Sequence, residues 1–275
     1  MPEAPVWDER YPDKARLRLE VEALQEAVLE ALLELTPAAN VAGVYTKGST
    51  VKAWDSPLDY VPELSDVDIQ LLLHDERRLR TREGALEFQA GYEARFRARV
   101  PEPLHLPRPQ IILLREMLSS FAPAPARAVK TLYGRPYPEV HPLTDTTGMR
   151  KFDQEKLLQY ASPEILAGFP LSWIDKPGKY LFLALRDLSW RVGPAGSRVL
   201  SLLGVEFDRA WGSNRTEIYA QLQELGQAEF AQRYAGFYLE GWRFFLSGYQ
   251  DSEAGRRALL AGARVLELGL DLAAR

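Results

Sequence analysis

Two aspartates separated by one residue are the clearest chemical feature of the sequence. Asp66 and Asp68 flank the start of an apolar run, Val67–Leu73, that is typical of a buried strand. Side chains alternate along a strand, so both carboxylates are expected on one face while Val67 and Ile69 point into a core. Mg²⁺ prefers hard oxygen ligands and is commonly held by one or two carboxylates together with substrate phosphates. The pair therefore predicts a magnesium site for a phosphorylated ligand.

A turn that can cradle a phosphate precedes the aspartates. The run Val41–Thr46 is also typical of a buried strand, and Lys47, Gly48 and Ser49 interrupt it. Glycine lets the backbone approach a phosphate, whose oxygens can then accept from successive N–H groups and a serine hydroxyl. Lys47 places a cation beside that turn. Each motif alone is most often an ordinary turn or helix cap, but their order along two strands favours a triphosphate site.

The flanking segments predict the elements that position these motifs. Apolar residues recur at helical spacing over Lys14–Leu35, and a second helix is expected over residues 82–99. A third strand is expected at Gln110–Leu114, after a proline-rich connector. The long stretch Thr50–Leu64, with two prolines, reads as a loop that is either functional or mobile. The order helix, strand, strand, helix, strand indicates a mixed sheet covered by helices.

The second half of the chain has a different character. Residues 122–150 are rich in Pro, Thr and Gly with little periodicity, as at a domain junction. No strand is expected beyond Arg150, and helices are predicted over Gln154–Tyr160, Lys179–Val192, Arg215–Tyr249 and Glu253–Ala274. We therefore expect an α+β protein, with a mixed-sheet domain at residues 1–135 followed by an all-α helical bundle at residues 150–275.

Composition narrows the classes of partner. The 275 residues carry a net charge of −4, from 34 basic and 38 acidic side chains spread along the chain. This balance favours neither a stable nucleic acid complex nor an anionic membrane surface. There are no cysteines, hence no disulfides or thiolate metal sites, and no signal peptide or membrane-length apolar run is evident. The expected location is the cytoplasm, and the sequence sets no oligomeric state.

The two motifs together resemble a known superfamily. KGST at residues 47–50 followed by SDVDIQLLL at residues 65–73 is similar to the signature of the DNA polymerase beta-like nucleotidyltransferases. The resemblance covers about residues 40–115. TLYGRPYP at residues 131–138 and the helical remainder resemble bacterial members that carry a helical substrate-binding domain, such as antibiotic nucleotidyltransferases. The resemblance implies transfer of a nucleoside monophosphate from a nucleoside triphosphate, with ATP as the candidate, to an acceptor hydroxyl, releasing pyrophosphate.

The resemblance also implies roles for individual residues. Asp66 and Asp68 would ligate Mg²⁺, and a metal pair would neutralise phosphoryl charge and align the attacking and leaving oxygens. Gly48 and Ser49 would hold the triphosphate, and Lys47, before Gly48, and Ser65, before Asp66, are further candidates to bind it. Triphosphate binding also requires cations, and the helical part offers Lys179 and Arg186 as candidates. The helical domain would select the acceptor, a small molecule or, as the lesser alternative, a protein side chain.

Two departures from the superfamily pattern leave alternatives open. The loop between Ser49 and Asp66 is longer than usual, so Trp54, Asp55, Asp59 or Tyr60 are candidates to border the site. Many members have a third carboxylate on the next core strand, where this chain has Gln110, a neutral residue that cannot act as a base. The nearest stand-ins in sequence are Glu102 and Glu116.

One alternative function follows from that glutamine, and another does not depend on it. One is a catalytically inactive relative that binds a nucleotide or a partner protein without chemistry. Another is a member of a toxin and antitoxin pair that modifies a partner protein.

Overall fold

The chain divides into two compact units. The computed structural model describes residues 5–118, 121–143 and 145–275. The unit that we call the sheet unit comprises Glu9–Lys52 and Asp66–Thr144, and the helical unit comprises Met1–Asp8, Ala53–Ser65 and Asp145–Arg275. The expected α+β class, a mixed sheet followed by a helical region, is confirmed.

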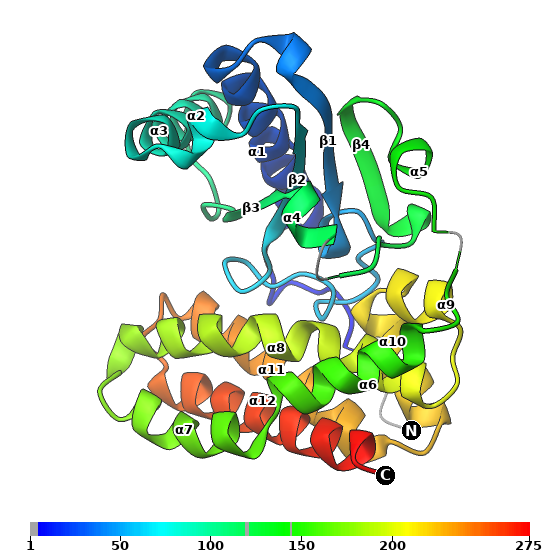
Figure 1. Ribbon diagram of the computed structural model, residues 1–275. Helices are drawn as coiled ribbons and strands as arrows, with labels where there is room; N and C mark the ends of the chain where they lie inside the picture. The colour runs from blue at the N-terminus through cyan, green and yellow to red at the C-terminus, as the bar shows by residue number, and fades with distance from the viewer. Residues whose placement is uncertain (1–4, 119–120, 144) are drawn as a thin grey trace. The chain divides into compact units, whose positions relative to one another are not determined.

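The sheet unit is built on a four-stranded mixed sheet with the order β3-β2-β1-β4 (Figure 1). The strands are β1 Val41–Lys47, β2 Val67–Leu73, β3 Pro109–Leu113 and β4 Val129–Gly134. β1 pairs antiparallel with both β2 and β4, whereas β2 and β3 run parallel. The end of β1 therefore lies beside the beginnings of β2 and β3, so residues at these three positions meet at one edge.

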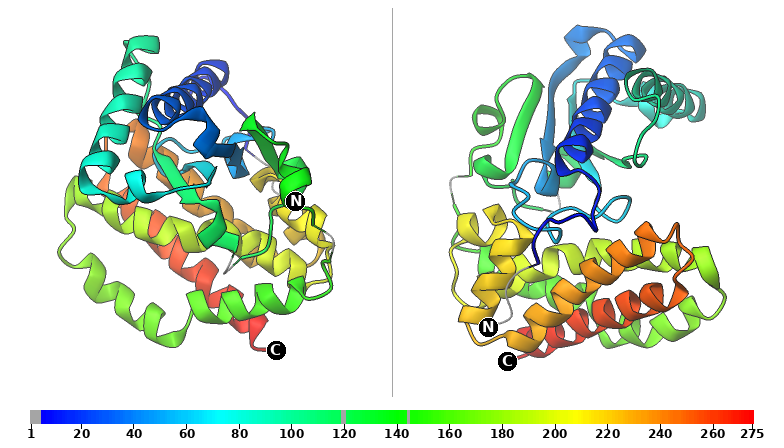
Figure 2. Two further views of the ribbon diagram at one scale, coloured as in Figure 1. Left: turned by 45° about the horizontal axis from the view of Figure 1, so that its top comes forward. Right: turned by 180° about the vertical axis from the view of Figure 1, so that it is seen from behind.

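The two faces of the sheet are covered differently. Helix α1, Lys14–Leu35, lies along one face, and α3, Arg82–Arg99, packs against α1, as the view from behind in Figure 2 shows. On the opposite face, Tyr45 and Leu72 form a buried cluster with residues of α4 and α5. The short helices of this unit are α2 Arg77–Arg80, α4 Leu114–Leu118 and α5 Tyr137–Val140. Its 3₁₀ turns are η1 Ala38–Asn40, η2 Gly48–Thr50 and η3 Ala126–Ala128, and a further turn, η4 Gly178–Tyr180, belongs to the helical unit.

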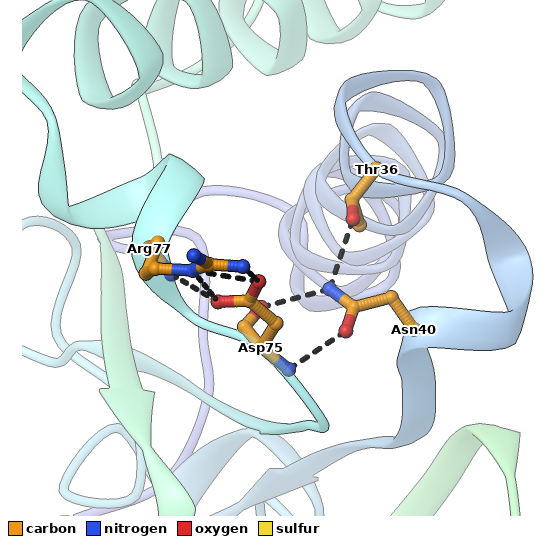
Figure 3. Close-up of polar contacts among 4 residues, drawn as sticks. All are labelled: Thr36, Asn40, Asp75 and Arg77. Atoms are coloured by element: carbon orange, nitrogen blue, oxygen red, sulfur yellow. Dashed lines mark hydrogen bonds and ion pairs between the residues drawn. The ribbon is translucent and has the colours of Figure 1, made fainter.

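Hydrogen bonds fasten the end of the sheet at which β1 begins and β2 ends (Figure 3). The Asn40 amide nitrogen donates to the Thr36 hydroxyl at 2.9 Å and to the Asp75 carbonyl at 2.8 Å. The Asn40 side-chain oxygen accepts from the Asp75 N–H at 2.7 Å. Hydrogen bonds from Arg77 lower the pKa of the Asp75 carboxyl to about 2. The α1–β1 and β2–α2 junctions are thereby tied together.

The helical unit is a bundle in which α8, α11 and α12 pack side by side and α6 packs on α8. Its helices are α6 Met149–Tyr160, α7 Pro163–Trp173, α8 Leu181–Leu202, α9 Phe207–Gly212, α10 Arg215–Glu224, α11 Ala228–Leu246 and α12 Ser252–Ala273. Within residues 5–118, 121–143 and 145–275, no helix has both the length and the apolarity needed to cross a membrane.

The structure corrects three expectations about elements. Strand β4 lies within residues 122–150, where the sequence suggested only a junction. The helix expected over Arg215–Tyr249 is two helices, because the chain breaks at Gly226, whose φ of +74° is left-handed. Helix α8 runs through Pro194 to Leu202, since its apolar face remains buried beyond the proline. The other predicted helices and strands are present, with ends shifted by a few residues.

Candidate functional site

The two aspartates lie at the edge where β1 ends and β2 and β3 begin. In the antiparallel pair Lys47 is opposite Asp68, and in the parallel pair Asp68 is opposite Gln110. Because the Gln110 amide reaches both Asp66 and Asp68, the carboxylates lie side by side, as strand alternation predicts. The register thus places Gln110 next to the aspartates.

Each carboxylate has its own cation. Lys47 Nζ lies 3.6 Å from Asp68 Oδ2, and Arg108 Nε donates to Asp66 Oδ1 at 2.9 Å. Two negative and two positive groups therefore make a cluster with no net formal charge. The sequence analysis did not identify Arg108, which directly precedes β3. The sequence does show a basic residue just before the strand that carries Gln110. Only the pairing of β2 with β3, however, brings Arg108 close to Asp66.

Gln110 bridges the two carboxylates with its amide nitrogen. With that nitrogen facing the aspartates, it donates to Asp68 Oδ1 at 2.9 Å and to Asp66 Oδ2 at 3.3 Å. The opposite orientation would point the amide oxygen, an acceptor, at two carboxylate oxygens that are also acceptors. Gln110 is exposed at the edge of the sheet. It therefore contributes hydrogen bonds without charge.

The surroundings of Asp68 disfavour its charged form. Loss of hydration raises the pKa of Asp68, the Lys47 ammonium opposes that rise, and the neighbouring Asp66 carboxylate adds to it. The side chain keeps 21% of its surface exposed, so solvent and ions can still reach it. A carboxylate with these neighbours gains from a nearby cation.

The Gly48–Thr50 turn follows β1 directly and lies next to Asp68. Gly48 has a left-handed φ of +75°, and a Cβ placed on it would lie 3.1 Å from Asp68 Oδ2. The Thr50 hydroxyl donates to the Lys47 carbonyl at 3.0 Å and lies 3.1 Å from the buried Thr46 hydroxyl. Gln25 of α1 in turn donates to Thr46 at 3.2 Å. The turn that carries Gly48 and Ser49 is therefore anchored to the helix beneath it.

The remaining candidate residues belong to the helical unit. The Ser65 hydroxyl accepts from the Val61 N–H and from Arg215 Nη1, both at 3.0 Å. Arg186 Nη1 donates to the carbonyls of residues 63 and 64 at 3.2 and 2.8 Å. Lys179 is exposed, with its ammonium 5.7 Å from the centre of the Tyr180 ring. Ser65 and Arg186 thus hold the loop before Asp66 in place.

The loop residues proposed to border the site contact the helices of their own unit. Trp54 stacks on Tyr60 with ring centres 4.3 Å apart. Asp59 accepts from the N–H and the hydroxyl of Thr216 at 2.9 and 2.7 Å, and Asp55 accepts from Asn214 at 2.6 Å. These contacts give the loop residues a structural role in the helical unit.

The two glutamates considered as substitutes for Gln110 have other partners. Glu116 lies on α4, beyond the far end of β3, and pairs with Arg80 at 2.7 Å. The backbone carbonyl of Glu102 accepts a hydrogen bond from Arg16.

The donor set fits a metal ion shared with phosphates. Asp66 and Asp68 supply two adjacent carboxylates, which matches the way Mg²⁺ is commonly held beside a phosphorylated substrate. Among the described residues no group of three or more His, Cys, Asp and Glu side chains could hold a metal by itself. Any such ion would complete its shell with water or with oxygens of a ligand.

Comparison of the chain with models of protein families finds no match. Comparison with curated proteins also finds none. Function has to be inferred from the geometry of these residues and from the motif that they form.

Proposed function

We propose that this protein is a Mg²⁺-dependent nucleotidyltransferase. It transfers a nucleoside monophosphate from a nucleoside triphosphate, with ATP as the candidate, to a hydroxyl of an acceptor, for which a small molecule is the leading class. One observation carries the proposal: the carboxylates of Asp66 and Asp68 lie side by side, and a Cβ built on the left-handed Gly48 would lie 3.1 Å from Asp68 Oδ2, so the turn is next to them. A phosphate on that turn would lie beside both aspartates.

The residues of the turn and its cations would bind and orient the triphosphate. The absence of a side chain on Gly48 opens the backbone to phosphate oxygens, and Ser49 adds a hydroxyl next to it. Lys47 and Arg108 supply positive charge on either side of the carboxylates. Asp66 and Asp68 would hold Mg²⁺, which when bound neutralises developing phosphoryl charge.

Transfer itself makes one bond and breaks another. The acceptor oxygen bonds to the α-phosphorus, the bond from that phosphorus to the pyrophosphate oxygen breaks, and the acceptor proton passes to water. Gln110 is neutral and cannot accept this proton. A group other than Gln110 therefore takes the proton. The lack of a base at this position limits the rate of transfer but not the binding of the nucleotide.

A second candidate function is a nucleotide-binding protein without transferase activity. The hydrogen bonds from Gln110 to both aspartates favour it, because they occupy the carboxylates with a residue that has no charge or basicity. The two candidates differ in one observable. Steady release of pyrophosphate with an acceptor panel supports the transferase, whereas binding without release supports the second candidate.

The proposal is tested by calorimetric titration of a nonhydrolysable ATP analogue in the presence of Mg²⁺. We expect saturable binding to the native protein and a loss of affinity on the order of tenfold or more in Asp66→Asn and Asp68→Asn, since each removes a charged metal ligand. Asp75→Asn is a matched control, because it removes an arginine-paired carboxylate at the other end of β2. Equal affinity in all four proteins would contradict the proposal.

A further inference from the structure

The charges of the aspartate cluster balance within the protein. Lys47 pairs with Asp68, Arg108 pairs with Asp66, and the Gln110 amide donates to both carboxylates. The oxygens that would face a divalent cation are therefore already occupied by two cations and one amide. Adding a dication without moving these groups would bring four positive charges against two negative ones, which is electrostatically unfavourable.

The groups that occupy the carboxylates are able to leave. Lys47 contacts Asp68 at 3.6 Å, longer than the usual charge-assisted hydrogen bond, and its side chain is 27% exposed. Arg108 reaches Asp66 through its Nε, and half of its side chain is exposed. Partly exposed ion pairs of this kind hold weakly in water. Rotation of the Gln110 amide would exchange its nitrogen for an oxygen, which is a neutral metal ligand.

A polyphosphate offers these displaced cations new partners. Its oxygens are anionic, and the turn at Gly48 that could receive them is next in sequence to Lys47 and in contact with Asp68. Arg and Lys bind phosphate oxygens as well as carboxylates.

The geometry points to Lys47 and Arg108 as exchangeable counter-cations that couple the two ligands: they compete with the divalent cation for Asp66 and Asp68, and once displaced they bind the triphosphate. This inference rests on the proposed function and deepens it. The divalent cation alone binds weakly, because it has to displace two cations. The triphosphate alone also binds weakly, because the same cations are held by the aspartates. Each ligand removes the obstacle to the other, which is positive coupling.

If Lys47 and Arg108 compete with the metal ion, removing either charge should change the affinities for a divalent cation and for a polyphosphate in opposite directions. Removing the charge of Lys47 leaves Asp68 without its competitor, so the affinity for a divalent cation alone should rise. The same change removes a phosphate ligand, so the affinity for a polyphosphate alone should fall. A residue with a merely structural role would lower both affinities or neither.

The experiment uses the full-length chain and two separate probes. Binding of Mn²⁺ alone is measured from the free Mn²⁺ signal in electron paramagnetic resonance, and binding of tripolyphosphate alone is measured by calorimetry in the presence of EDTA. We expect Lys47→Gln and Arg108→Gln each to tighten Mn²⁺ binding and weaken tripolyphosphate binding, by several-fold in each direction, within the usual range of such couplings. Arg77→Gln is the matched control, since it breaks an arginine–aspartate pair at the other end of β2.

The outcomes separate this inference from the proposed function. Suppose that Mn²⁺ binds the native protein and that Asp68→Asn abolishes this binding. If Lys47→Gln and Arg108→Gln then weaken Mn²⁺ binding or leave it unchanged, the exchange is contradicted and the metal site stands. If the native protein shows no Mn²⁺ binding that depends on Asp66 or Asp68, with or without tripolyphosphate, the proposed function fails together with the inference. Opposite shifts in both variants, with none in Arg77→Gln, support the exchange.

Discussion

Gly48 is the residue at which backbone conformation and chemistry meet. Its φ of +75° disfavours any other residue, and an added Cβ would lie 3.1 Å from Asp68 Oδ2. We predict that Gly48→Ala lowers the free energy of unfolding by about 1 kcal/mol or more, because alanine is strained in the left-handed conformation. We also predict that it weakens the binding of Mg²⁺ together with the ATP analogue. Chemical denaturation and calorimetry measure the two effects separately.

Gly226 offers a control for the backbone part of that prediction. Its φ of +74° is almost the same, and nothing lies within 4 Å of a Cβ built on it. Gly226→Ala should therefore reproduce the loss of stability without the loss of ligand binding. If Gly48→Ala and Gly226→Ala both bind the analogue as well as the native protein does, Gly48 has only a conformational role.

At this scale the sequence was informative about the carboxylates and less so about their partners. Strand alternation predicted that Asp66 and Asp68 lie side by side, and motif position predicted Gln110 near them. Arg108 was missed because its contact depends on the register between β2 and β3, which a residue pattern does not specify when the strands are far apart in sequence.

Glu20 on α1 fixes the connector that leads into β3. It is 1% exposed and accepts from the Leu104 N–H at 2.7 Å and the His105 N–H at 3.3 Å, while the His105 Nδ1 lies 2.9 Å from its Oε2. Burial acts to raise the pKa of Glu20, but the hydrogen bonds and charge of His105 and the Leu104 N–H together hold this pKa below its ordinary value. The ionised form is thus favoured in the folded state.

The lowered pKa makes this contribution depend on pH. Because the folded-state pKa lies below the ordinary value of 4.5, the stabilisation is fully present above pH 4.5 and is lost as the pH falls through the folded-state pKa. We predict that Glu20→Gln costs about 1–3 kcal/mol near neutral pH and that the difference from the native protein shrinks below pH 4.5. Urea unfolding at several pH values measures it. Glu22→Gln, exposed on the same helix, should show neither effect.

The elements were predictable where a long periodic pattern was present. The bounds of α1 and α3 agree with the helical spacing of their apolar residues, and β1 and β2 agree with their apolar runs. β4 was not recognised, because Lys130 and Thr131 interrupt its apolar residues and its flanks carry the Gly and Pro of a junction. The helix break at Gly226 was missed because apolar spacing continues on both sides of it.

At the scale of the whole molecule, the loop at Ala53–Ser65 belongs to a different unit from the one predicted. The sequence suggested an insertion of the first domain that bordered its site, yet the loop belongs to the helical unit. Trp242 Nε1 donates to the Pro57 carbonyl at 2.8 Å, and Thr216 donates twice to Asp59. Such partners, more than 150 residues away in the chain, leave no local signal in the sequence. The helical unit therefore extends along the chain up to the residue before Asp66.

Crystallography with Mn²⁺ and a nonhydrolysable ATP analogue tests the central claim most directly. In an anomalous difference map, the account predicts a metal peak within coordination distance of a carboxylate oxygen of Asp66 and of Asp68, with triphosphate oxygens completing its shell at the Gly48 turn. Ordered metal and triphosphate bound away from these two aspartates, at concentrations that saturate the protein in solution, would contradict it.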